Sequence, residues 1–221
     1  MEIPAGKTAC LVGPTGCGKS TLLTLLSRLY DPTSGVVRID GADIRKIPVK
    51  ALRNRIGNIL HDCQVFTGTI AENISYGEPE ATHEQIVAAA KLAGLDEFVE
   101  AQPNAYAATL GRGGLALSAT QLVQLAVARA VVMQPAILTV DDTYSTIEED
   151  VEKRLRAAVR TALQDRTIII ATSRLSICED ADIVVTMQNG KIVQTGSHEG
   201  LLAEPGLYRR MYMRQMGMED L

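Results

Sequence analysis

Three patterns are missing from this sequence of 221 residues, and each absence excludes a class of protein. The four cysteines are scattered without C-x-x-C spacing, which disfavours a zinc site and favours a reducing compartment. Basic side chains are not in excess, because the net charge is −4, whereas binding to a nucleic-acid backbone requires clustered lysine and arginine. We therefore expect no nucleic-acid partner, and we interpret the short basic run at 209–214 as a solvated helix face.

A membrane-long apolar run is also missing. The most apolar stretch, residues 122–140, is interrupted by Gln124, Arg129, Gln134 and Pro135, so it does not resemble a membrane span. We find no signal-peptide pattern, internal repeat or low-complexity segment. The remaining composition, 46% hydrophobic and 22% charged, is that of a globular chain long enough for one well-buried domain.

Strand-like and helix-like segments alternate along the chain. The continuous apolar run at 8–13 is typical of a strand buried on both faces, and leucines at helical spacing follow at 20–30. Further strand-like runs lie at 136–141, 166–172, 182–187 and 191–196. The alternation predicts an α/β fold with a mostly parallel, doubly wound sheet. The mostly helical block at about 69–133 is expected to be an inserted helical subdomain of a single domain covering 1–221.

A phosphate-binding loop is the most specific motif. Residues 13–21 read GPTGCGKST and match G-x-x-x-x-G-K-[ST] between a predicted strand and a predicted helix. Such a loop turns backbone N–H groups toward phosphate oxygens, and the helix N-terminus adds partial positive charge. We expect Lys19 to reach the β- and γ-phosphates, Ser20 to ligate Mg²⁺ and Thr21 to hold the α-phosphate region. The expected nucleotide-binding residues are Gly13, Pro14, Thr15, Gly16, Cys17, Gly18, Lys19, Ser20 and Thr21.

The loop alone does not distinguish a kinase, a GTPase, a helicase or a transport ATPase. The order of four later stretches along the chain distinguishes among these families. The stretches lie at 28–41, 65–77, 115–130 and 137–142. Together with the loop they resemble the ATP-binding-cassette (ABC) domain of exporter-type ABC transporters, over essentially the whole chain. The P-loop NTPase fold is the fold that this resemblance implies.

The resemblance also implies ligands, partners and a location. ATP and Mg²⁺ would be bound between two such domains arranged head to tail, hetero- or homodimeric, and the pair would dock on membrane-spanning domains at the cytoplasmic inner face of a membrane. The family's adenine-stacking aromatic residue lies further upstream than this chain begins. We therefore expect the chain either to be N-terminally truncated relative to the family or to hold the base differently, and no residue here is assigned to stacking.

Several family positions are substituted, and they are those that act in hydrolysis. Asp141 matches the Mg²⁺-organising carboxylate, but Asp142 stands where the family has the glutamate that polarises the attacking water. The Asp142 side chain is one methylene shorter than glutamate. It either keeps the catalytic role with a shorter reach, or it merely caps the next turn. Ser173 stands at the family's switch histidine, and a serine hydroxyl is a poor general base near pH 7.

The sensing glutamine of the family corresponds to His61 when counted back from Phe66; Gln64 would take this role only in a remodelled loop. His61 would hydrogen-bond water or ligate the metal weakly, or it is an exposed loop residue without a role. Arg112 replaces an acidic residue, so a contact to the membrane domain would differ.

The signature Leu-Ser-Gly-Gly-Gln is altered as well. Its residues that would contact a partner's ATP are Ser118, Ala119, Thr120 and Gln121. Both glycines, which permit close backbone approach, are lost at Ala119 and Thr120, and this should weaken closure of the dimer.

Two main hypotheses follow. In the first, the chain is a degenerate exporter domain, one half of a heterodimer, that binds Mg·ATP and hydrolyses it slowly. In the second, it is an active ABC ATPase in which Asp142 and His61 are working substitutes. A non-transport ABC ATPase of DNA maintenance is a remote third, because about a hundred residues without sustained heptads separate the loop from the signature.

Overall fold

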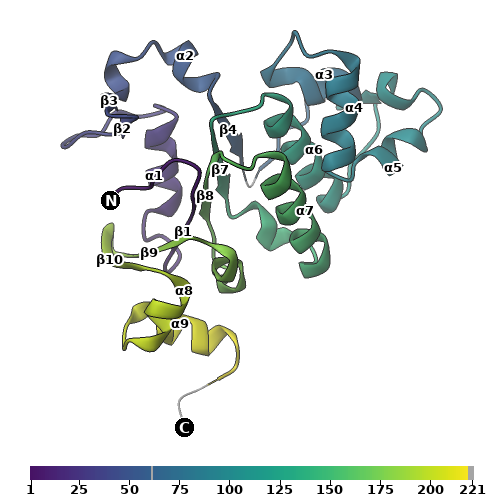
Figure 1. Cartoon of the computed structure of the whole chain (residues 1–221). Coiled ribbons are helices and arrows are strands. Elements are labelled where there is room, and N and C mark those ends of the chain that lie inside the picture. Colours follow the sequence, from purple (N-terminus) through teal and green to yellow (C-terminus); the bar gives the residue numbers. More distant parts are fainter. Residues whose placement is uncertain (61, 219–221) are drawn as a thin grey trace.

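The computed structural model describes residues 1–60 and 62–218, and within them six strands form one central sheet (Figure 1). The strand order is β10-β9-β1-β8-β7-β4. All neighbours are parallel except β9 and β10, which form an antiparallel hairpin at one edge. The strands of this sheet are β1 (Thr8–Val12), β4 (Ile56–Ile59), β7 (Ile137–Asp141), β8 (Thr167–Ala171), β9 (Ile183–Gln188) and β10 (Lys191–Gly196). The predicted α/β class and mostly parallel sheet are confirmed.

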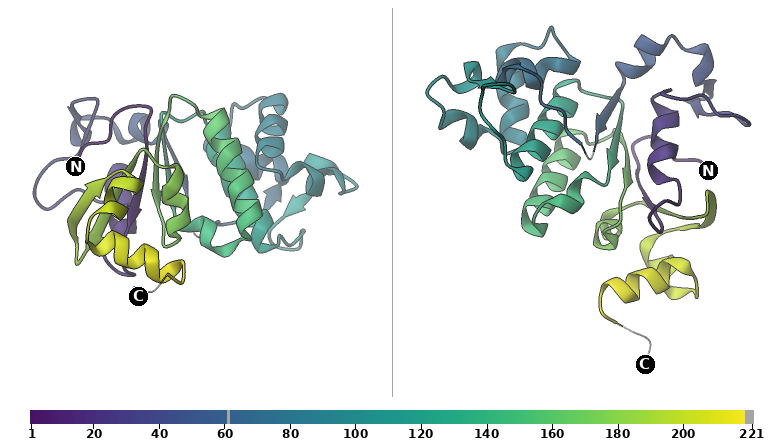
Figure 2. Two further views of the ribbon diagram at one scale, coloured as in Figure 1. Left: turned by 60° about the horizontal axis from the view of Figure 1, so that its bottom comes forward. Right: turned by 180° about the vertical axis from the view of Figure 1, so that it is seen from behind.

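Helices cover both faces of the sheet, as the side-chain alternation of its strands requires. On β1, Leu11 packs with Leu23 of α1 on one face, whereas Cys10 and Val12 join the larger hydrophobic cluster on the other face. In Figures 1 and 2, α1 lies on one side of the sheet and α6 and α7 lie on the opposite side. The helices are α1 (Lys19–Leu26), α2 (Val49–Arg53), α3 (Ile70–Ile74), α4 (His83–Leu92), α5 (Asp96–Glu100), α6 (Ala119–Val132), α7 (Glu149–Ala162), α8 (His198–Ala203) and α9 (Leu207–Gln215).

Short elements complete the chain. Two small antiparallel pairs lie outside the central sheet, β2 (Arg38–Ile39) with β3 (Ala42–Asp43), and β5 (Gly68–Thr69) with β6 (Thr109–Leu110). The 3₁₀ turns are η1 (Ile44–Lys46), η2 (Ser75–Gly77), η3 (Ala105–Ala107), η4 (Thr143–Thr146) and η5 (Leu175–Asp180).

The helical segment from α3 to α6 shares its core with the sheet. Ile70, Ile86 and Val123 belong to the same buried cluster as Val12 and Ile59. A capping box of Thr82 and Gln85 starts α4. Hydrophobic contact therefore continues from the sheet into the helical segment.

The helix after the phosphate loop is shorter than its leucine spacing predicts. α1 ends at Leu26, because Ser27 leaves helical geometry and Arg28 has a left-handed φ of 50°. Arg28 donates to the carbonyl oxygens of Ile44 and Ile47. These long-range contacts of the Arg28 guanidinium stabilise a turn after Leu26, where the leucine spacing alone predicts that the helix continues.

Candidate nucleotide-binding site

The loop between β1 and α1 needs glycine at its first position. Gly13 has φ 151°, and a Cβ there would lie 2.2 Å from the Met187 carbonyl oxygen and 2.7 Å from Cys17 Sγ. Gly16 and Gly18 have φ of 77° and 104°, in the left-handed region that disfavours other residues. The loop thus curls against β9, while Pro14, Thr15 and Gly16 stay exposed.

Positive charge gathers on the inner side of this loop. The Nζ of Lys19 donates to the carbonyl oxygen of Gly13 at 2.9 Å and to that of Pro14 at 3.4 Å. Gly18, the N-cap of α1, offers no side chain to the first N–H groups of the helix. Those N–H groups, together with the Lys19 ammonium, form a site suited to phosphate.

Two hard oxygen ligands meet beside the loop. Ser20 Oγ donates to Asp141 Oδ1 at 2.8 Å, which joins the start of α1 to the carboxyl end of β7. Mg²⁺ in nucleotide sites is held by one or two protein oxygens plus phosphate oxygens and water, so this pair fits Mg²⁺. Among the described residues, no group of three or more His, Cys, Asp or Glu side chains converges as a metal site.

A polar contact behind the pair holds α1 against the sheet. The side-chain oxygen of Asn58 on β4 accepts from Ser27 Oγ at 2.9 Å and from Thr139 Oγ1 at 2.7 Å. Ser27 and Thr139 are both buried. Because Thr139 precedes Asp141 by two residues on the same strand, this contact helps to fix the position of Asp141 relative to α1. This contact was not predicted from the sequence, because three isolated polar residues form no recognisable pattern.

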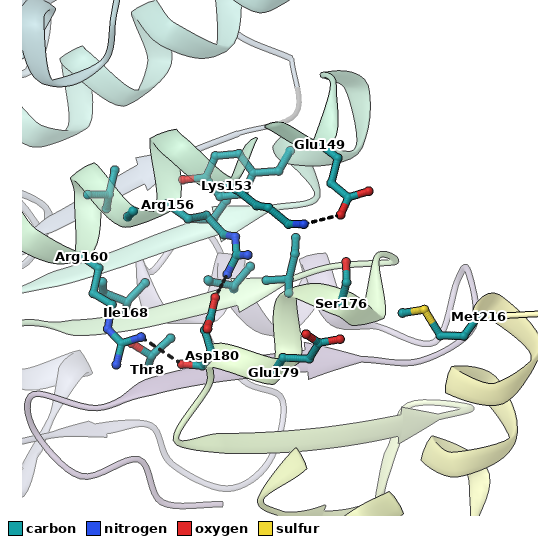
Figure 3. Close-up of a pocket in the computed structure, with 16 residues that line it drawn as sticks. Thr8, Glu149, Lys153, Arg156, Arg160, Ile168, Ser176, Glu179, Asp180 and Met216 are labelled. Atoms are coloured by element: carbon teal, nitrogen blue, oxygen red, sulfur yellow. Dashed lines mark hydrogen bonds and ion pairs between the residues drawn. The ribbon is translucent and has the colours of Figure 1, made fainter. Parts of the chain in front are cut away.

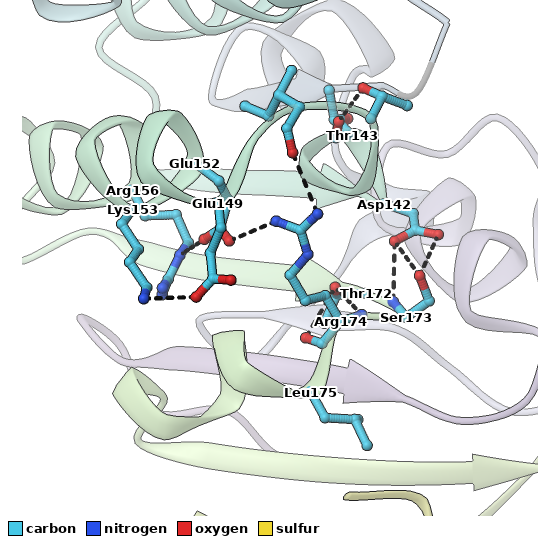
Figure 4. Close-up of polar contacts among 12 residues, drawn as sticks. Asp142, Thr143, Glu149, Glu152, Lys153, Arg156, Thr172, Ser173, Arg174 and Leu175 are labelled. Atoms are coloured by element: carbon cyan, nitrogen blue, oxygen red, sulfur yellow. Dashed lines mark hydrogen bonds and ion pairs between the residues drawn. The ribbon is translucent and has the colours of Figure 1, made fainter. Parts of the chain in front are cut away.

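Asp142 and Ser173, which the sequence pattern aligns with hydrolytic positions of the family, lie side by side (Figure 4). Ser173 donates its backbone N–H to Asp142 Oδ1 at 3.0 Å, and its hydroxyl lies 3.0 Å and 3.1 Å from the two carboxylate oxygens. Asp142 itself has a left-handed φ of 45°, and its N–H donates to Ala171 of β8 at 2.8 Å. The Asp142 carboxylate is therefore turned toward the start of the loop after β8.

A buried ion cluster supports that loop. Glu152 of α7, 0% exposed, accepts from Arg156 of the same helix and, at 3.0 Å, from Arg174 next to Ser173 (Figure 4). Glu152 occupies the buried stripe of α7 with Leu155 and Val159. An acidic residue at an inward-facing position of an amphipathic helix is a sequence feature that could have predicted this cluster.

The signature residues begin α6. Ser118 Oγ accepts from the Gln121 N–H and Gln121 Oε1 accepts from the Ser118 N–H, a capping box. Ser118 and Ala119 are exposed and Thr120 is half-buried. In the described part of the chain no hydrogen bond joins this turn to the phosphate loop. His61 lies outside the described residues, and Arg112 is exposed.

Comparisons with known proteins agree with these features. A family model described as "ABC transporter" matches residues 1–145. The chain is 42% identical over 211 residues to Multidrug resistance protein homolog 65 of Drosophila melanogaster, covering 96% of this chain and 16% of that protein. It is also 42% identical to the fatty acid ABC transporter ATP-binding/permease protein of Mycobacterium bovis, over 93% of this chain and 33% of that protein.

A solved structure is similar over almost the full length. The structure of a bacterial Atm1-family ABC exporter with ATP bound superposes with a TM-score of 0.93 at 36% identity, covering 98% of this chain and 38% of that chain. The chain thus spans well under half the length of these relatives. None of the helices that the structure describes has both the length and the hydropathy needed to cross a membrane.

Proposed function

Because the chain belongs to the ABC transporter family, we propose that it is an exporter's ATP-binding domain that binds Mg·ATP and hydrolyses it slowly. Its phosphate loop and the Ser20–Asp141 contact favour binding. The contact between Asp142 and Ser173 is the observation that supports slow hydrolysis, because it engages the short carboxylate that would have to polarise the attacking water.

In this proposal the residues of the site bind the phosphates, the metal ion and the attacking water. Lys19, the N–H groups at the start of α1 and the 13–21 loop bind the phosphates, with Thr21 at the α-phosphate. Ser20 and Asp141 ligate Mg²⁺, which supplies charge neutralisation of the phosphates when bound. Asp142 is a short carboxylate whose reach toward water is limited by its bond to Ser173. A displacement of about 1 Å costs on the order of 100-fold in rate.

The partners follow from the same family assignment. We propose a second nucleotide-binding domain, in a heterodimer, facing Ser118–Gln121, and membrane-spanning domains that place the pair at the cytoplasmic face of a membrane. The segment of about 69–133 is proposed as the helical subdomain. The Cβ of Ala119 and the side chain of Thr120 would keep the partner's nucleotide further from α6 than glycine would.

The test is ATP turnover of the purified chain beside its Asp142→Glu/Ser173→His variant. We expect tight Mg·ATP binding and slow turnover in the unmodified chain, and an increase on the order of 10²-fold in the variant, the size of a general-base contribution. Lys19→Ala, which removes the phosphate-binding cation, is the control without nucleotide binding. Rapid turnover by the unmodified chain would contradict the proposal.

The second candidate is an active ATPase that uses Asp142 as its base, with His61 as the proposed sensing residue. Its support is that Ser173 positions the Asp142 carboxylate through two donors. Asp142→Asn separates the two candidates. Loss of substantial turnover with binding preserved favours the active enzyme, whereas unchanged slow turnover favours the degenerate domain.

A further inference from the structure

A cavity of about 540 Å³ lies between α7, η5 and the adjoining strands (Figure 3). None of the residues at 13–21 lines it. Its volume falls within the range of about 300–1,000 Å³ typical of small-molecule sites. The apolar part of its wall comes from Val140, Val159, Ile168, Ile170 and Ile177.

One wall residue carries a hydroxyl group. Tyr144 lines the cavity and is 2% exposed. Burial raises the pKa of this phenol, so it remains a protonated donor. A ligand with a polar atom in the cavity could accept a hydrogen bond from this phenol.

The charged groups of the cavity include one cation, Arg160, that forms no ion pair within the described residues, although its charge contributes to lowering the pKa of Asp182. The Glu149 carboxylate pairs with Lys153, and Asp180 pairs with Arg156. Glu179 accepts from the Tyr212 hydroxyl at 2.8 Å. Arg160, in contrast, donates only to the backbone carbonyl of Asp180, at 3.5 Å, and forms no ion pair in the described part of the chain.

We propose that this cavity binds an organic anion with an apolar body. The acid group pairs with Arg160, the apolar body packs on Ile168 and Ile170, and Tyr144 donates to a polar atom of the ligand. Figure 3 shows Arg160 at one end of the cavity, near Ile168 and Thr8, and Met216 of the C-terminal segment at the other end. The acid therefore binds at the Arg160 end. This site is separate from the proposed nucleotide site.

The experiment titrates the 221-residue chain with 1-anilinonaphthalene-8-sulfonate, an apolar anion that fluoresces in dry sites. We expect one saturable site. Arg160→Gln weakens binding by about fivefold, the effect of losing one exposed ion pair. The matched control is Arg166→Gln, which removes an exposed arginine outside the cavity and leaves the affinity unchanged. Tyr144→Phe, which keeps the ring and removes the hydroxyl, also weakens binding.

A neutral probe of the same shape, N-phenyl-1-naphthylamine, separates charge from apolar contact. It binds the unmodified chain and the Arg160→Gln variant equally well if Arg160 acts on the acid group. Three results would each overturn the proposal. The first is equal affinity of Arg160→Gln and the unmodified chain for the sulfonate probe, the second is an absence of saturable binding, and the third is displacement of the probe by Mg·ATP. Only variants whose melting temperature equals that of the unmodified chain are compared.

Discussion

The Asp142 carboxylate is held by the residue that stands at the switch position, Ser173, through that residue's N–H and its hydroxyl. The two residues are 31 positions apart in the chain, at the ends of the neighbouring parallel strands β7 and β8. In this arrangement the serine hydroxyl contacts the carboxylate directly.

Removal of the Ser173 hydroxyl tests what this contact does. In Ser173→Ala the backbone N–H still donates to Asp142, so the carboxylate is retained but gains freedom. Because the contact restrains Asp142, we expect ATP turnover in this variant to stay unchanged or to rise. A fall in turnover on the order of tenfold or more would instead show that Ser173 assists Asp142. General acid–base assistance is worth about 10²-fold or more in rate. Single-turnover hydrolysis at saturating Mg·ATP is the measurement.

The phosphate loop provides a matched pair of glycine substitutions. Gly13→Ala forces a Cβ into the Met187 carbonyl at 2.2 Å, so the loop or β9 must move. We expect a stability loss of about 3 kcal/mol or more, the sum of overpacking and backbone strain. At Gly16, φ is 77° and nothing lies within 4 Å of the added Cβ, so Gly16→Ala should cost only about 1 kcal/mol of strain.

Urea unfolding midpoints of the two variants measure this difference. The m-value should stay constant if only stability changes. Equal destabilisation by Gly13→Ala and Gly16→Ala would show that β9 yields easily at Met187, contrary to the packing described above.

The buried acid of α7 should matter more than its exposed neighbour. Glu152→Gln leaves Arg156 and Arg174 without their buried carboxylate, and breaking a buried ion pair costs about 3–5 kcal/mol. Because Arg174 adjoins Ser173, Mg·ATP turnover should also change. Glu149→Gln removes an exposed pairing with Lys153 one turn earlier and should leave the melting temperature unchanged. Thermal unfolding by circular dichroism compares the two variants, and equal effects would refute a structural role for Glu152.

An acid-sensitive contact holds the start of β1. Asp182 accepts from the Lys7 ammonium and from the Thr8 N–H, both at 2.8 Å, and the Lys7 bond is the main cause that lowers the pKa of Asp182. A carboxylate with a lowered folded pKa stabilises the fold above its unfolded pKa of about 3.9 and loses that effect as pH falls.

We therefore expect Asp182→Asn to lower stability at pH 7 and to flatten the decline in stability below about pH 4. Denaturant unfolding at pH 7, 5 and 3 is the measurement. Identical pH profiles for the variant and the unmodified chain would rule out this contribution. Asp62→Asn, at an exposed position with no ion pair in the described part of the chain, is the control.

The sequence alone predicted those features that depend on neighbours along the chain. The apolar run of β1, the glycines and Lys19 of the loop and the leucines of α1 are contiguous, so their spacing predicts a strand, a phosphate loop and a helix. The capping boxes at Thr82 and Ser118 likewise join residues three positions apart, although the box at Ser118 was not predicted. The alternation of strands and helices was sufficient for the parallel sheet, since parallel neighbours need crossover connections.

Only the tertiary structure decided which distant polar groups meet. The contacts of Asp142 with Ser173 and of Glu152 with Arg174 join residues 31 and 22 positions apart, and no local pattern selects those partners. The cavity likewise arises where α7, η5 and the strands pack without filling the space between them, and this depends on side-chain shapes from several segments. Spacing therefore determined where phosphate is expected to bind, whereas packing determined how the substituted hydrolytic residues are held.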